Sequence, residues 1–149
     1  MTATDATLAL DDASGPGHFL FGQEHEALRA AIRAFVRREI VPHVDDWEVT
    51  TFPDAIVRRM GDLGFLGLSV PEEYGGQGGD YFTNLVLAEE MGLSGCGGLL
   101  MGLSVHTDMV MPPLLQFGTE EQKRAWVVPG VRGEKMYALG ITEPDAGSD

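Results

Sequence analysis

The sequence is poor in cysteine and in positive charge. Its one cysteine, Cys96, excludes an internal disulfide and a cysteine-based zinc site, so nothing indicates an oxidising compartment. Only 10 lysines and arginines stand against 23 aspartates and glutamates, which gives a formal net charge of −13. Because such a charge repels phosphate backbones, we expect no nucleic-acid partner.

The sequence also lacks the segments that anchor or export a protein. Glycine and polar residues interrupt every apolar stretch before it reaches the roughly 20 residues needed to span a bilayer. No lysine or arginine precedes Arg29, which argues against a secretory signal or a transit peptide. We therefore expect no membrane span and a cytoplasmic location. A length of 149 residues with 44% hydrophobic residues is enough for one buried core.

Hydrophobic periodicity predicts a mostly α-helical protein. Residues 1–18 are small and polar without an apolar face, and we expect them to be a disordered lead. Residues 19–135 are expected to form the helical domain, because apolar side chains recur there at helical spacing. The predicted helices cover residues 23–40, 54–63, 80–91, 99–117 and 120–128.

Prolines and caps set the predicted limits of these helices. Pro42 is expected to stop the first helix, Pro112-Pro113 to kink or end the fourth, and Pro129 with Gly130 to close the fifth. Thr119 and Gln122 have the spacing of a capping box, and Gly64 has the position of a C-terminal cap.

The texture changes after residue 135. Residues 136–142 form an apolar run, and residues 143–149 follow as a loop of small and polar residues. A lone strand with nothing to pair against is not stable. We therefore expect a helical domain followed by the first strand and loop of a truncated β-domain, over residues 136–149.

Several motifs favour ordinary structural roles. The run of glycines at 75–79 fits neither the dinucleotide fingerprint nor the P-loop, and a tight loop explains it. His106 and the other histidines stand at no metal-ligand spacing, so we interpret them as core or surface residues. The pairs Glu89-Glu90 and Glu120-Glu121 are expected to be solvated helix faces.

Met101, Val105 and Met109 recur at i, i+4 and i+8 on the fourth predicted helix. Core packing is the default explanation of such a stripe, and this helix is apolar enough to be buried on most faces. A groove for a flexible apolar ligand is the alternative, since methionine adapts to variable chain shapes. Periodicity alone does not decide between the two.

The sequence ends with the residues Gly140-Ile141-Thr142-Glu143-Pro144-Asp145-Ala146-Gly147-Ser148-Asp149. This run resembles the first signature of the acyl-CoA dehydrogenase family. Three further segments match in the family's order and spacing, at 64–76, 104–106 and 118–123. Two shorter motifs, at 41–43 and 78–81, resemble the long-chain branch in particular.

This resemblance implies a helical N-terminal domain, a central β-domain, a helical C-terminal domain, and FAD between them. Family members oxidise an acyl thioester, of coenzyme A or a carrier protein, to the trans-2-enoyl form. A glutamate takes the α-proton, the flavin takes the β-hydrogen as hydride, and an electron-transfer flavoprotein usually accepts the electrons. The complete enzyme would be a homo-oligomer.

The resemblance also assigns roles along the terminal segment. Leu139, Ile141 and Thr142 match positions that lie along the flavin ring, with Thr142 hydrogen-bonding its polar edge. Gly147 and Ser148 match the turn that meets the FAD pyrophosphate, and Ser148 also borders the thioester.

For the stripe of Met101, Val105 and Met109, the resemblance implies the wall of the acyl cavity. Asp145 departs from the pattern, because the family most often has glycine there. The segments in which the family places its catalytic glutamate match no residue of this chain, so no catalytic residue is assigned.

Two alternatives stay open. One is a non-catalytic helical interaction module derived from the family. The other keeps the flavin but changes the chemistry, to an oxidase or an amine N-hydroxylase that uses oxygen.

Overall fold

The computed structural model describes residues 19–147. The expected disordered lead, residues 1–18, and the predicted site residue Ser148 lie outside this range. The described elements are α2 (Gln23–Phe35), η1 (Val36–Ile40), η2 (Val41–His43), α3 (Val44–Trp47), α4 (Asp54–Asp62), η3 (Phe65–Gly67), η4 (Glu72–Tyr74), α5 (Tyr81–Gly92), α6 (Gly97–Ser104), η5 (Val105–Val110), α7 (Met111–Phe117), α8 (Glu120–Gln122), η6 (Lys123–Val127) and α9 (Val128–Val131).

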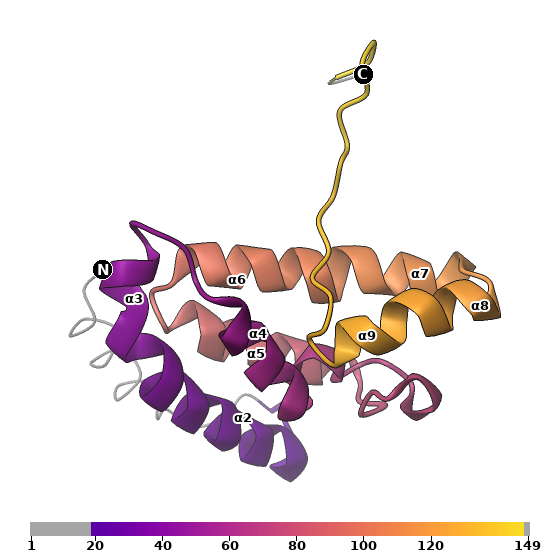
Figure 1. The fold of residues 1–149 in the computed structure, drawn as a ribbon. Coiled ribbons are helices and arrows are strands. Elements are labelled where there is room, and N and C mark those ends of the chain that lie inside the picture. Colours follow the sequence, from indigo (N-terminus) through magenta and orange to yellow (C-terminus); the bar gives the residue numbers. More distant parts are fainter. Residues whose placement is uncertain (1–18, 148–149) are drawn as a thin grey trace.

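The helices enclose one main core and a smaller second cluster. α2 lies along α5, and α6 continues through η5 into α7 along nearly one line (Figure 1). The main core includes Ile32, Phe35, Met60, Val86, Met91 and Leu99. The second cluster joins the loop before α5 to the last helices, through Val70, Tyr74, Met111, Val127 and Val131. The mostly helical fold predicted from the sequence is confirmed.

Pro42 and Pro112-Pro113 do not end the helical path as predicted, whereas α9 ends at Val131, one residue beyond the stop predicted at Gly130. Pro42, Pro112 and Pro129 each lie in the first turn of the next helical element rather than at the end of a helix. A π-type turn precedes each of them, and the backbone N–H just before the proline bonds five residues back: Val41 to Val36, Met111 to His106, and Val128 to Lys123.

The π-type turns explain why the helical path continues. Proline lacks an N–H and its ring crowds the carbonyl four residues earlier, which is what normally ends a helix. In the first turn of a helix an N–H has no partner to lose. The wide turn before each proline therefore restarts the hydrogen-bond pattern at the point where proline is tolerated.

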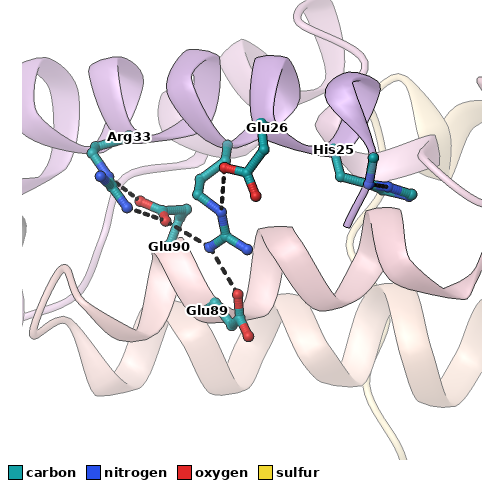
Figure 2. A network of polar contacts seen from close by, with 7 residues as sticks. His25, Glu26, Arg33, Glu89 and Glu90 are labelled. Atoms are coloured by element: carbon teal, nitrogen blue, oxygen red, sulfur yellow. Dashed lines mark hydrogen bonds and ion pairs between the residues drawn. The ribbon is translucent and has the colours of Figure 1, made fainter. Parts of the chain in front are cut away.

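The predicted solvated face at Glu90 is also wrong. Glu90 on α5 is 0% exposed and accepts hydrogen bonds from two arginines of α2 (Figure 2). Arg33 Nε and Nη2 each lie 2.8 Å from a Glu90 oxygen, and Arg29 Nη1 lies 3.0 Å from Oε1. Glu89, which is partly exposed, takes a second contact from Arg29 at 2.7 Å.

The helix caps and the glycine turn predicted from the sequence are confirmed. Thr119 and Gln122 form the predicted capping box. Gly64 follows α4 with a φ of +79°, a left-handed conformation that glycine adopts without strain. In the glycine loop, a Cβ on Gly76 would lie 2.0 Å from the Val70 carbonyl oxygen, so close approach of two backbones requires glycine there.

The predicted strand at 136–142 does not form. These residues have no regular secondary structure. Within residues 19–147, the one β-type contact is an isolated antiparallel bridge between Glu143 and Ala146. A strand is stabilised by a neighbouring strand, and none lies beside this segment in the described part of the chain. Among the described helices, none is both long and apolar enough to cross a membrane.

Candidate functional site

The predicted flavin segment leaves the body of the molecule. Residues after Glu134 cross in front of α6 and then run away from the helices (Figure 1). The side chains of Leu139 and Ile141 are 46% and 77% exposed, and Thr142 and Gly147 are exposed as well. The two apolar side chains thus lie in water, on a stretch of backbone without a strand partner.

The segment is fixed to the helices just before it departs. The Tyr137 N–H donates to Nδ1 of His106 at 3.3 Å, and the two rings stack with centroids 5.0 Å apart. The Tyr137 hydroxyl donates to the backbone carbonyl of Trp126. His106 is fully buried in η5, as expected for a core histidine.

The hydrogen bonds of His106 define its protonation state. Nδ1 accepts from Tyr137, so the ring proton lies on Nε2, which donates to the Gly130 carbonyl oxygen at 3.1 Å. Burial lowers the pKa of His106 below its usual range, which favours this neutral form. The imidazole therefore joins η5, α9 and the C-terminal segment without carrying a charge.

The stripe on α6 and η5 is a surface feature. Met101 and Met109 are 61% and 46% exposed and Val105 is half-buried, whereas Leu99 and Leu103 on the opposite face are buried. The expectation that this helix is buried on most faces is therefore wrong for one face. Core packing does not explain Met101 and Met109, and the ligand groove stays a prediction.

A pocket of about 390 Å³ lies on the adjacent side of η5, towards α5. Its lining residues are Ser69, Tyr81, Asn84, Leu85, Ala88, Asp108 and Pro112. The Asn84 amide donates to Ser69 Oγ at 3.0 Å and to Asp108 Oδ1 at 3.2 Å. Desolvation raises the pKa of Asp108. Neither the methionine stripe nor the flavin segment contributes to this pocket.

Other candidate chemistry is weak within the described residues. No group of three or more potential ligands is placed to hold a metal ion between residues 19 and 147. The Cys96 thiol is buried, and burial raises its pKa, so it is a poor nucleophile.

Comparison with known families decides the class of the protein. Residues 22–134 match the family model described as the acyl-CoA dehydrogenase N-terminal domain. The chain belongs to the acyl-CoA dehydrogenase family. This is the family that the resemblance in the sequence indicated.

Relatives and solved structures agree. The chain is 40% identical over 131 residues to the 3-(aryl)acrylate reductase of Clostridium sporogenes, covering 87% of this chain and 34% of that protein. It superposes on the acyl-CoA dehydrogenase of Geobacillus kaustophilus with a TM-score of 0.82 and 40% identity, over 89% of this chain and 35% of that one.

An acyl-CoA dehydrogenase from Bacillus anthracis complexed with FAD gives a TM-score of 0.79 at 33% identity. That match covers 87% of this chain and 23% of the other. The chain spans about a third of the length of the first curated relatives that it matches, at 35% and 34%.

The polar contacts that organise the acyl-CoA dehydrogenase domain were not predicted from the sequence. Arg29 and Arg33 stand four residues apart on one helix and could have indicated a shared acidic partner. The link between His106 and Tyr137 spans 31 residues and leaves no local signal. The same holds for Asn84 and Asp108, which are 24 residues apart.

Proposed function

We propose that this chain is the N-terminal part of an FAD-dependent acyl-CoA dehydrogenase that converts an acyl thioester to the trans-2-enoyl thioester. The observation that carries the proposal is a family helical domain with two exposed apolar elements where the resemblance implies ligand contacts. These are the stripe on α6 and η5 and the segment that begins at Leu139.

The exposed segment has the chemistry that a flavin requires. Leu139 and Ile141 offer apolar surface to the ring system, and both stand in water in this structure. Thr142 supplies a hydroxyl for the polar edge of the ring, and Gly147 leaves its backbone open to a phosphate. Ser148 would complete the phosphate turn and border the thioester. When bound, FAD supplies the acceptor for the β-hydrogen of the acyl chain.

The chain's own residues would then bind and orient the substrate. Met101, Val105 and Met109 form a wall along which the acyl chain lies, and burying these side chains against methylenes excludes water from both. We assign no proton-abstracting base to this chain. The thioester carrier is coenzyme A or a carrier protein, the electron acceptor is an electron-transfer flavoprotein, and the active form is a homo-oligomer. In this proposal the helical domain spans residues 19–135, and residues 136–149 begin the β-domain.

The test uses the native-length protein, which we define as this chain together with the β-domain and the C-terminal helical domain that the proposal implies. Its visible spectrum is recorded in the absence of oxygen, before and after addition of acyl-CoA. We expect a flavin spectrum that bleaches with acyl-CoA. Thr142→Ala should weaken FAD affinity about fivefold, the equivalent of one hydrogen bond of about 1 kcal/mol. Thr51→Ala, an exposed threonine on the loop before α4, is the matched control and should leave the affinity unchanged.

The alternatives give different results in the same experiment. Absence of bound flavin would support a non-catalytic interaction module and contradict the proposal. If oxygen is then admitted, a flavin that was reduced by substrate and consumes oxygen at each turnover would support an oxidase or an N-hydroxylase.

A further inference from the structure

Three parts of the molecule meet at the His106 imidazole. η5 carries the ring, α9 contributes the Gly130 carbonyl oxygen, and the C-terminal segment contributes the Tyr137 N–H. Both ring nitrogens are satisfied, at 3.1 Å and 3.3 Å. His106 is the residue through which the departing segment is hydrogen-bonded to η5.

The surroundings of Tyr137 are shaped to hold it at this place. Its ring stacks on His106 and meets Trp126 edge-on, and its hydroxyl bonds to the Trp126 carbonyl. A Cβ added to Gly130 would lie 2.7 Å from the Tyr137 ring, so the absence of a side chain there makes room for it. Lys135 also packs against Trp126, with its Nζ over the ring and 4.4 Å from the ring centre.

We propose that His106 is a positioning residue for the flavin segment. This inference rests on the proposed function, since it takes Leu139, Ile141 and Thr142 as flavin contacts. Leu139 is two residues beyond Tyr137, so a fixed Tyr137 confines it to a radius of about 7 Å. The anchor therefore determines where the segment starts, and fewer backbone torsions must be ordered when a ligand binds.

Two substitutions separate the hydrogen bond to the segment from the bond to α9. An asparagine amide occupies the place of Nδ1, so His106→Asn keeps an acceptor for the Tyr137 N–H and loses the contact with Gly130. A glutamine amide reaches the place of Nε2, so His106→Gln keeps the contact with Gly130 and loses the acceptor for Tyr137. His43→Asn, at an exposed histidine, is the control for loss of an imidazole.

The first readout is amide hydrogen exchange of Tyr137 in the 149-residue chain, followed by NMR. We expect His106→Gln to speed exchange at Tyr137 at least tenfold and His106→Asn to leave it within about threefold of wild type, with α2 and α5 unchanged in both. Equal acceleration throughout the domain, or no change at Tyr137, would overturn the proposal and make His106 an ordinary core residue. If His106→Gln fails to fold, Tyr137→Leu replaces it, with the same expectation of faster exchange confined to the segment.

The second readout is the FAD dissociation constant of the native-length protein. His106→Gln should weaken binding at least tenfold, and His106→Asn and His43→Asn should have much smaller effects. Faster exchange at Tyr137 with unchanged FAD affinity would show that the anchor does not position the flavin site. If the wild-type protein binds no FAD, the proposed function fails, and the exchange experiment alone then decides whether His106 holds the segment.

Discussion

Two regions of the molecule differ in how their side chains are buried and partnered. One is the interface between α2 and α5, and the other is the C-terminal segment. At the interface, Glu90 is completely buried, and both of its carboxylate oxygens accept a hydrogen bond from an arginine. On the segment, Ile141 is largely exposed and lies on backbone without a strand partner. The first region is complete within this chain, whereas the second presents groups for a ligand or for further structure.

The difference lies in what each region needs from outside. Hydrogen bonding to Glu90 raises the pKa of Arg33, so the arginine stays charged and the buried carboxylate stays compensated. Both partners, Arg29 and Arg33, come from neighbouring turns of α2. The segment has one such fixed point, Tyr137, and beyond it no comparable network within the described residues. We therefore expect stability to be concentrated at the interface of α2 with α5, and we propose that the segment and the stripe carry the function.

The largest expected effect is that of Glu90→Ala. The substitution removes the buried carboxylate that Arg29 and Arg33 share, while Arg29 keeps its contact with Glu89. Removing one partner of a buried ion pair costs about 3–5 kcal/mol. We expect the free energy of unfolding, measured by urea denaturation, to fall by that amount. The slope of this free energy against urea concentration should stay unchanged.

Glu89→Ala is the control for Glu90→Ala. Glu89 also contacts Arg29 but is partly exposed, and exposed ion pairs contribute about 0–1 kcal/mol. Equal losses for the two variants would mean that burial of Glu90 does not set the stability of the interface.

An intermediate effect, on specificity rather than stability, is expected for Val105→Trp in the native-length protein. If the stripe is a wall of the acyl site, the larger ring shortens the longest acyl chain accepted and leaves short substrates nearly unaffected. Each excluded methylene removes about 0.8 kcal/mol of burial, or roughly fourfold in kcat/KM. An equal loss for all chain lengths would show that Val105 serves packing alone.

The smallest expected effect is the pH dependence that His106 contributes. Burial lowers the pKa of folded His106, whereas the unfolded chain takes up this proton near pH ~6.5. The unfolded state then binds more protons, so the stability contribution is present above pH ~6.5 and is lost as the pH falls below it. In His106→Asn the decrease in unfolding free energy between pH ~7.5 and ~5.5 should be shallower than in the wild type.

The acidic pairs act in a lower range of pH. Hydrogen bonds from Arg38 and His25 lower the pKa of Glu39 and Asp80, so the stability from these carboxyl groups is lost only at more acidic pH. The pH dependence of the unfolding free energy also has an outcome that contradicts the prediction for His106. If the curves of wild type and His106→Asn are parallel between pH ~7.5 and ~5.5, burial of the neutral His106 ring does not contribute to this pH dependence.

Patterns confined to a few residues were predictable from the sequence. The buried face of α2 follows from the spacing of Ile32, Phe35 and Val36, and the cap at Thr119 follows from Gln122 three residues later. The resemblance to the family indicates the candidate flavin residues, and of these Leu139, Ile141, Thr142 and Gly147 lie on the surface.

Features that depend on tertiary partners were not predictable. Burial of Glu90 depends on α2 lying along α5, so its own helix gives no sign of it. The tolerance of Pro42 and Pro112 depends on the π-type turns before them, which composition does not indicate. The run at 136–142 has the composition of a strand, but a strand also requires a neighbour to pair with.

The proposal as a whole is that this chain folds the helical domain by itself and supplies only part of a flavin site. Titration of the 149-residue chain with FAD, followed by flavin fluorescence and combined with an acyl-thioester assay, tests it most directly. Ordering the segment costs roughly 1–2 kcal/mol of backbone entropy per residue, more than a few hydrogen bonds of about 1 kcal/mol each return. We therefore expect neither micromolar binding nor turnover. Micromolar binding together with turnover would contradict the proposal, and would mean that the chain completes its site by self-association.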